Sequence, residues 1–130
     1  MLVLDENLPA HQRQLLRDWR MRFRVIGVDV AAWGTDDEHL LPVLHRLAQP
    51  TLCSLDGDFY RPDWAHAHYA LVWLDVPDGR AAEFIRRFLK HPAFGSQARR
   101  MGTVDRVHAG GIGYWRVGRP SPMSVLWPPQ

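Results

Sequence analysis

The sequence predicts an α/β fold with a mostly parallel central sheet flanked by helices in a three-layer α/β/α arrangement. Three observations favour this class. Short apolar segments alternate along the chain with amphipathic ones, as expected where helices connect parallel strands. Residues 1–4 are continuously apolar, which is typical of a strand covered on both faces. Turn-forming or acidic residues then follow the apolar segments.

The first half of the chain is expected to form a strand-helix-strand-helix-strand unit. Pro9 fits the first turn of a helix, with Asn7 as a candidate cap, and Leu15, Leu16 and Trp19 give that helix an apolar face. The expected elements are strands over residues 1–4, 23–28 and 51–55, one helix from Pro9, and a second helix from residues 36–38 to about residue 48.

The second half is expected to continue the alternation of strands and helices. We expect a strand over residues 69–76, a helix over 79–91 and a last strand over 112–117. Residues 120–130 contain four prolines and are expected to form a tail that is loosely ordered or lies on the surface. The chain is therefore expected to be a single domain over residues 1–119 with a proline-rich tail.

Composition excludes several classes of protein. With 130 residues, 46% hydrophobic and 23% charged, the chain suits one globular domain. The single cysteine, Cys53, excludes a disulfide within the chain and a cysteine-based zinc site. No apolar run reaches membrane-spanning length and the N-terminus lacks signal-peptide features, so a cytoplasmic protein is expected. A net charge of +2 and a pI of about 9.1 permit an anionic partner.

Acidic residues follow the apolar segments at three separate places. Asp5 comes directly after the first expected strand and Asp56 after the third, while Asp37 and Glu38 open the second helix. Ligands of open α/β sheets bind beyond the carboxyl ends of the strands, so these acids are expected at one rim, with Asp58 beside them. Two carboxylates about 4 Å apart at an effective dielectric near 20 repel by about 4 kcal/mol. Such a cluster either protonates or holds cations, and oxygen ligands favour Mg²⁺ or Mn²⁺.

Each of these acids also has a simpler explanation. Residues 36–38 are favourable at a helix N-terminus, Asp56 with Gly57 is typical of a hairpin turn, and Asp5 could belong to a helix cap. The conjunction of strand-end acids in one sheet favours a site.

Three motifs carry a resemblance to a known family. They are Leu4-Asp5-Glu6-Asn7-Leu8-Pro9, Asp37-Glu38-His39-Leu40-Leu41 and Leu52-Cys53-Ser54-Leu55-Asp56-Gly57-Asp58-Phe59. In order and spacing they resemble the short PIN-like family known as DUF5615, which is similar to the toxin nucleases of bacterial toxin-antitoxin pairs and to Mut7-C domains. The resemblance covers roughly residues 2–75, and the first and third motifs together are its specific part.

The resemblance implies a PIN-like sheet whose acids hold Mg²⁺ or Mn²⁺ and hydrolyse RNA phosphodiesters with metal-activated water. It implies the toxin component of a type II toxin-antitoxin system, with RNA as substrate, a cognate antitoxin as partner and a homodimer as a further expectation. The metal ligands and catalytic residues that it implies are Asp5, Asp37 and Asp56, with Asp58 as a further catalytic acid. The residues expected to support this site or to contact substrate are Asn7, Glu38 and Ser54.

Two residues of the third motif depart from the family pattern. Gly57 stands where the family usually has a basic residue, and Cys53 is unusual at its position. These departures bear on activity more than on fold. They leave open a second function, a catalytically inactive PIN-like domain that binds a protein or a nucleic acid. A metal-dependent phosphatase on a similar sheet is a further alternative.

Basic residues and histidines supply other candidates. Arg13, Arg17 and Arg20, on the first helix and its exit, could follow a nucleic-acid backbone toward the acidic rim or simply form a solvated helix face. His66 and His68 lie two apart on what is expected to be a strand. Their side chains would then share one side, either as metal ligands or as half-exposed histidines that enter the strand.

Overall fold

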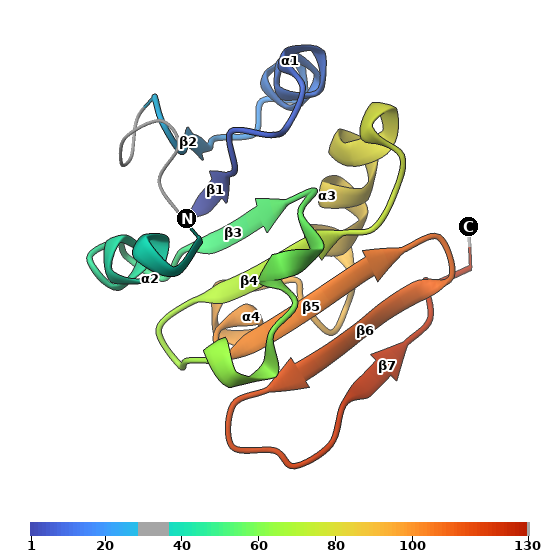
Figure 1. The fold of residues 1–130 in the computed structure, drawn as a ribbon. Coiled ribbons are helices and arrows are strands. Elements are labelled where there is room, and N and C mark those ends of the chain that lie inside the picture. The colour runs from blue at the N-terminus through green and yellow to red at the C-terminus, as the bar shows by residue number, and fades with distance from the viewer. Residues whose placement is uncertain (29–36, 130) are drawn as a thin grey trace.

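The described residues form an α/β fold around a seven-stranded sheet (Figure 1). The structure, a computed structural model, describes residues 1–28 and 37–129, without the side chains of Asp37 and Glu38. None of the described helices is long and apolar enough to cross a membrane. The strands are β1 (Leu2–Leu4), β2 (Arg24–Val25), β3 (Thr51–Ser54), β4 (Ala70–Leu74), β5 (Thr103–His108), β6 (Gly111–Arg116) and β7 (Met123–Val125). The helices are α1 (Ala10–Asp18), α2 (Asp37–His45), α3 (Ala81–Lys90) and α4 (Gln97–Arg100), with 3₁₀ turns η1 (Gly57–Phe59), η2 (Pro62–Trp64) and η3 (Asp78–Arg80).

The sheet is mostly parallel, and its strand order is β2-β1-β3-β4-β5-β6-β7. The strands β1 to β5 pair in parallel, whereas β6 runs antiparallel to β5 and β7 antiparallel to β6. The chain moves outward from β1 to β2 and then returns to place β3 on the other side of β1. In open α/β sheets, such a reversal leaves a crevice outside the carboxyl ends of the two strands, here β1 and β3.

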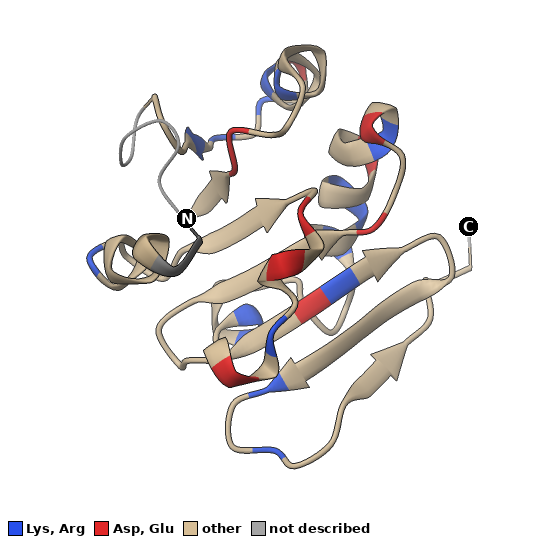
Figure 2. Ribbon diagram, viewed as in Figure 1, with Lys and Arg blue, Asp and Glu red and all other residues tan. Residues whose placement is uncertain are grey.

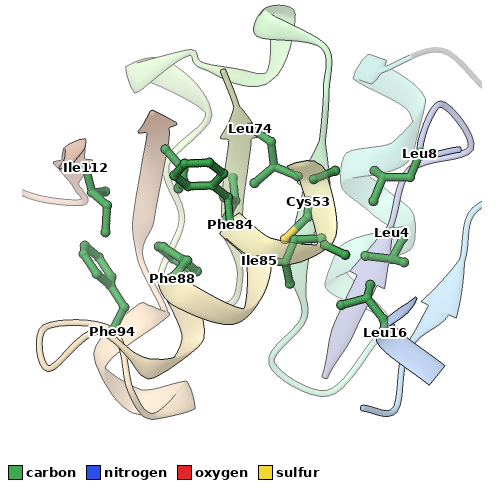
Figure 3. Close-up of a cluster of buried hydrophobic side chains, with 14 residues drawn as sticks. Leu4, Leu8, Leu16, Cys53, Leu74, Phe84, Ile85, Phe88, Phe94 and Ile112 are labelled. Carbon is green, nitrogen blue, oxygen red and sulfur yellow. The ribbon is translucent and has the colours of Figure 1, made fainter. Parts of the chain in front are cut away.

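Helices cover both faces of the sheet. Side chains alternate along each strand, so Leu4 and Cys53 belong to one apolar cluster and Val3 and Leu52 to the other. The first cluster includes side chains of α1 and α3, and Figure 3 shows those of α3 packed against the sheet. The second cluster includes Leu40 and Leu44, so α2 covers the opposite face. The predicted α/β class with a mostly parallel sheet and flanking helices is confirmed.

The first half of the chain follows the predicted order of strands and helices, but β2 is shorter than the predicted strand over 23–28 and α2 ends before residue 48. No side-chain hydrogen bond caps α1, because the Asn7 side chain bonds to the end of β3 instead. Leu15 was predicted on the apolar face of α1 but is 37% exposed, whereas Leu16 is fully buried. Asp36, expected among the first residues of the second helix, lies outside the described residues.

The second half contains two strands that the sequence did not predict. β5 was missed because Asp105 and Arg106 interrupt its apolar pattern. β7 lies within the tail that was expected to be loosely ordered or to lie on the surface. Beyond β7, the Trp127 indole donates a hydrogen bond to the His108 carbonyl at 2.8 Å, and its ring centroid lies 5.8 Å from that of Phe84. This segment is therefore paired with the sheet and packed near α3.

Cys53 lies in β3 and is completely buried. Its partners in the strands on either side are the apolar residues Leu4 and Val72. Burial raises the pKa of the Cys53 thiol to about 12. The thiol therefore stays protonated at neutral pH.

Candidate active site at the carboxyl ends of β1 and β3

The candidate site lies where β1 and β3 end side by side. Asp5 is the first residue after β1, and its backbone N–H still donates to the Cys53 carbonyl of β3 at 2.9 Å. Ser54 is the last residue of β3, and Asp56 follows two residues later. The parallel register thus brings two segments that are about fifty residues apart to one point. This point is the reversal in strand order, where open α/β sheets bind their ligands.

The Ser54 hydroxyl is the centre of the site. It is fully buried and donates to Asp5 Oδ2 at 2.7 Å. The Ser54 Oγ also accepts hydrogen bonds from Asn7 Nδ2 at 3.2 Å and from the Asp56 backbone N–H at 3.0 Å. One hydroxyl therefore fixes the Asp5 carboxylate and the backbone that carries Asp56.

Asp5 is buried between hydrogen-bond donors that favour its ionisation and carboxylates that oppose it. The residue is 7% exposed, and its Oδ1 accepts a hydrogen bond from the Glu6 backbone N–H at 2.8 Å. Burial raises the pKa of the Asp5 carboxyl, the hydrogen bonds from Ser54 and the Glu6 backbone lower it, and the charges of Glu6 and Asp56 raise it further. Within the described part of the chain, the two side-chain charges that shift this pKa are both negative. A cation bound here would relieve that repulsion.

Asn7 joins the two strand ends. Its Nδ2 donates to Ser54, and its Oδ1 accepts from the Leu55 backbone N–H at 3.3 Å. Both ends of the amide therefore hold the loop after β3 against the loop after β1. The expected supporting residues Asn7 and Ser54 lie together beside Asp5.

Asp56 and Asp58 open the turn η1. The Asp56 Oδ1 accepts from the Asp58 backbone N–H at 2.9 Å, which caps η1, while the Asp58 side chain is exposed. A Cβ added at Gly57, between them, would lie 3.1 Å from the Trp73 ring. The close Trp73 ring therefore gives a packing reason for glycine at this departure from the family pattern.

The acids at the start of α2 are described only by their backbone. α2 begins at Asp37, but the side chains of Asp37 and Glu38 lie outside the described part of the structure. Among the described residues, no group of three or more His, Cys, Asp or Glu side chains is placed to hold a metal ion. The predicted metal and its ligands therefore stay predictions.

Asp75 is a strand-end acid that the sequence analysis missed. It directly follows β4, which ends at Leu74, whereas the predicted strand continued to residue 76 and therefore placed Asp75 inside it. Its Oδ2 lies 2.7 Å from Arg106 Nη2 and 2.9 Å from Arg106 Nε. Because this carboxylate has a cationic partner, it differs from Asp5.

The two candidate histidines do not lie on a strand, since β4 begins at Ala70. A third histidine, His45 of α2, lies beside them, with its ring centroid 4.4 Å from His66 and 5.7 Å from His68. Burial lowers the pKa of His45, and the neighbouring imidazoles lower it further. The His68 ring nitrogen Nε2 lies 2.6 Å from the Leu47 carbonyl oxygen. The three histidines therefore form a contact between α2 and the turn before β4.

The three arginines of α1 and its exit lie in different surroundings. Arg17 has its guanidinium carbon 5.0 Å from the centroid of the Phe23 ring, and Arg20 is exposed with a φ of 61°. Arg13 is partly buried, and its Nε has no hydrogen-bond partner among the described atoms.

Figure 2 shows cationic residues on α1 and α3, and acidic residues in the loops after β1, β3 and β4.

No family model matches the chain, and no curated protein or solved structure matches it either. The α/β class and the strand order follow from the chain's own structure. The PIN-like type stays a prediction from the three motifs, and the described geometry is the basis for any function proposed.

Proposed function

We propose that the protein is a metal-dependent ribonuclease of PIN-like type, the toxin component of a type II toxin-antitoxin system. It would hydrolyse RNA phosphodiesters with metal-activated water. The observation that supports this function best is the Asp5 carboxylate, which is buried at the β1/β3 reversal and has carboxylates as its charged neighbours. Acids in such surroundings are characteristic of sites that bind cations.

The donor atoms suit a hard divalent cation. Asp5 and Asp56 offer carboxylate oxygens, which Mg²⁺ and Mn²⁺ prefer. Within the described residues each Asp5 side-chain oxygen accepts one hydrogen bond, and a carboxylate oxygen has a second lone pair. By the family resemblance, Asp37 would be the third ligand, with Asp58 and Glu38 in support.

When bound, the metal would supply an acidified water and neutralise charge on the phosphate. The chain's own contribution is to hold the ligands in place. Ser54 fixes Asp5 Oδ2 and the Asp56 backbone, and Asn7 ties the two loops together. Ligands held in this way lose little freedom when the metal and substrate bind.

The expected partners follow from this function. A toxin of this type would act on RNA in the cytoplasm, would be neutralised by a cognate antitoxin protein and would form a homodimer. These partners rest on the motif resemblance.

Cleavage of a mixed-sequence single-stranded RNA tests the proposal. The parent protein, Asp5→Asn and Asp63→Asn are each incubated with RNA and Mg²⁺ or Mn²⁺, with EDTA as a further control. Asp63 is an exposed acid beside Arg61 and lies outside the site, so its variant should cut as the parent does. Cleavage by the parent that disappears in Asp5→Asn and in EDTA supports the nuclease.

A second candidate is a PIN-like domain that binds a protein or nucleic acid without catalysis. It is favoured by Gly57, which stands where the family usually has a basic residue. The same experiment separates the two functions. Folded parent protein that leaves RNA intact with either metal, and whose unfolding temperature neither metal raises, supports the binding domain.

A further inference from the structure

Two adjoining hollows lie beside α3, away from the acidic site. The first, of about 220 Å³, lies between the exit of α1 and the last turns of α3. The second, of about 360 Å³, lies between the end of α3 and the segment after β7. Because α3 leads from the carboxyl end of β4 back to β5, which is parallel to it, the last turn of α3 lies toward the amino ends of the strands. The first hollow is lined by Trp19, Met21, Arg86, Leu89 and Lys90, and the second by Arg87, Lys90, His91, Trp127, Pro128 and Pro129.

The two hollows, which we call the α3 groove, combine apolar walls with cationic side chains. They adjoin at Lys90, which lines both. The guanidinium carbon of Arg86 lies 3.9 Å from the Trp19 ring centroid, and that of Arg87 lies 4.5 Å from the Trp127 ring centroid. Among the described residues, no acidic side chain lines either hollow. The groove is therefore apolar in its walls and positive at the surface.

The positive charge of the groove is only weakly neutralised within the described part of the chain. Arg86 and Lys90 have no carboxylate within salt-bridge distance there. Arg87 Nη1 lies 3.8 Å from Glu83 Oε2, but Glu83 also pairs with Arg80. Three cations on neighbouring turns of one helix repel one another, and an anionic partner would relieve that repulsion.

We propose that the α3 groove binds an acidic segment of a partner protein. Bulky apolar side chains of that segment would fill the hollows, and its carboxylates would pair with Arg86, Arg87 and Lys90. An RNA strand would bring its bases to Trp19 and Trp127, but arginines already lie over both rings. The hollows also offer apolar surface to anchor side chains, which a phosphate backbone does not use. This surface is independent of the proposed nuclease activity.

A peptide selection on the intact protein tests the groove. A displayed library of random peptides is selected on the parent, and the enriched peptides are synthesised with a fluorescent label. Their binding is measured by fluorescence polarisation to the parent, to Lys90→Glu and to the double variant R86E/K90E. The control R46E/R119E makes the same change in net charge at exposed sites away from the groove.

We expect the enriched peptides to combine acidic with bulky apolar residues and to bind the double variant at least about tenfold more weakly, with unchanged binding to the control. Lys90→Glu, at an exposed residue, should retain the parent's unfolding temperature and lose part of the binding. The proposal is overturned if no peptide is enriched, or if the peptides bind all four proteins alike. It is equally overturned if only labelled poly(U) RNA or a second copy of the chain occupies the groove.

Discussion

Asp5 and Asp105 are both buried carboxylic acids of the same sheet, 7% and 0% exposed, and they differ in their surroundings. Asp5 lies at the open end of β1, where its charged neighbours are Glu6 and Asp56. Asp105 lies inside β5, between Val72 of β4 and Tyr114 of β6, and its charged neighbours are Arg116 and Arg100. Burial raises the pKa of both carboxyls.

The difference shows that a buried acid alone does not mark a functional site. Asp105 accepts a hydrogen bond from Thr103 at 2.8 Å, and cationic neighbours lower the pKa that burial raises. Its Oδ1 has no hydrogen-bond partner among the described atoms, but the side chain is sealed inside the sheet, away from ligands in solution. Asp5 has carboxylate neighbours and lies at the reversal in strand order, so a cation from solution would stabilise its charge beyond what the hydrogen bonds from Ser54 and the Glu6 backbone provide.

The largest expected effect is the difference in RNA cleavage between variants of Asp5 and of Asp105. Asp5→Asn should reduce metal-dependent RNA cleavage at least about a thousandfold, because the amide cannot replace a charged metal ligand. Asp105→Asn should cleave within about twofold of the parent, since Asp105 is sealed inside the sheet. Initial rates with Mn²⁺ measure both. Equal losses in two folded variants would remove the functional distinction between the acids.

The next effect concerns the pH dependence of stability. Because the pKa of Asp105 in the folded protein lies well above its ordinary value of 3.8, the folded state binds this proton more tightly than the unfolded state. Its contribution to the free energy of unfolding is therefore greatest below pH 3.8 and is lost as pH rises toward the folded-state pKa.

Urea denaturation across this pH range should show the loss in the parent. For one titrating group, the free energy of unfolding can change by at most about 1.4 kcal/mol per pH unit. Asp105→Asn should remove this part of the slope, while the exposed Asp63→Asn should retain it. Parallel curves for the parent and Asp105→Asn would show that this carboxyl is ionised alike in both states.

A smaller effect is expected at Ser54, on the Asp5 side of the comparison. Ser54→Ala removes a hydrogen bond that lowers the pKa of Asp5, so that pKa should rise further. If cleavage needs ionised Asp5, the acid limb of the pH–rate profile should move to higher pH and the rate at neutral pH should fall about tenfold. Ser54→Thr, which keeps the hydroxyl, is the control. An unmoved acid limb in Ser54→Ala would mean that the hydroxyl does not act through Asp5.

The smallest effect tests the packing beneath Asp56 and Asp58. Gly57→Ala would place a Cβ 3.1 Å from the Trp73 ring, which must shift. We expect a loss of about 1 kcal/mol in the free energy of unfolding. Gly79→Ala is the matched control, because nothing lies within 4 Å of its added Cβ. Equal stabilities of the two variants would show that Trp73 moves aside freely.

The sequence predicted the parts of the fold in which local pattern and tertiary role agree. β1 and β3 are buried on both faces, so the sequence placed each of them to within one residue and found the acids after them. β5 was missed because Asp105 is a charged residue type in a fully buried position, which hydrophobic pattern cannot anticipate. β7 was missed because prolines on both sides of it favour irregular structure.

The site was predicted as a set of positions and not as a network. The strand-end rule brought Asp5 and Asp56 to one rim. It could not predict that Ser54 would bond to both segments, because this depends on register between β1 and β3. For the same reason Asn7 was taken for a helix cap, although its amide reaches across to Leu55. The pairing of Asp75 with Arg106 likewise depends on a contact between strands.

The buried Cys53 has a practical consequence for the experiments. At neutral pH only about one thiol in 10⁵ with a pKa near 12 is ionised, and the thiolate is the form that reacts with labelling reagents. A cysteine introduced on the surface would therefore be labelled selectively without removal of the natural one. In the protein without an introduced cysteine, Cys53 would react with such reagents only when β3 becomes exposed. Its modification rate would thus report how often the middle of the sheet opens.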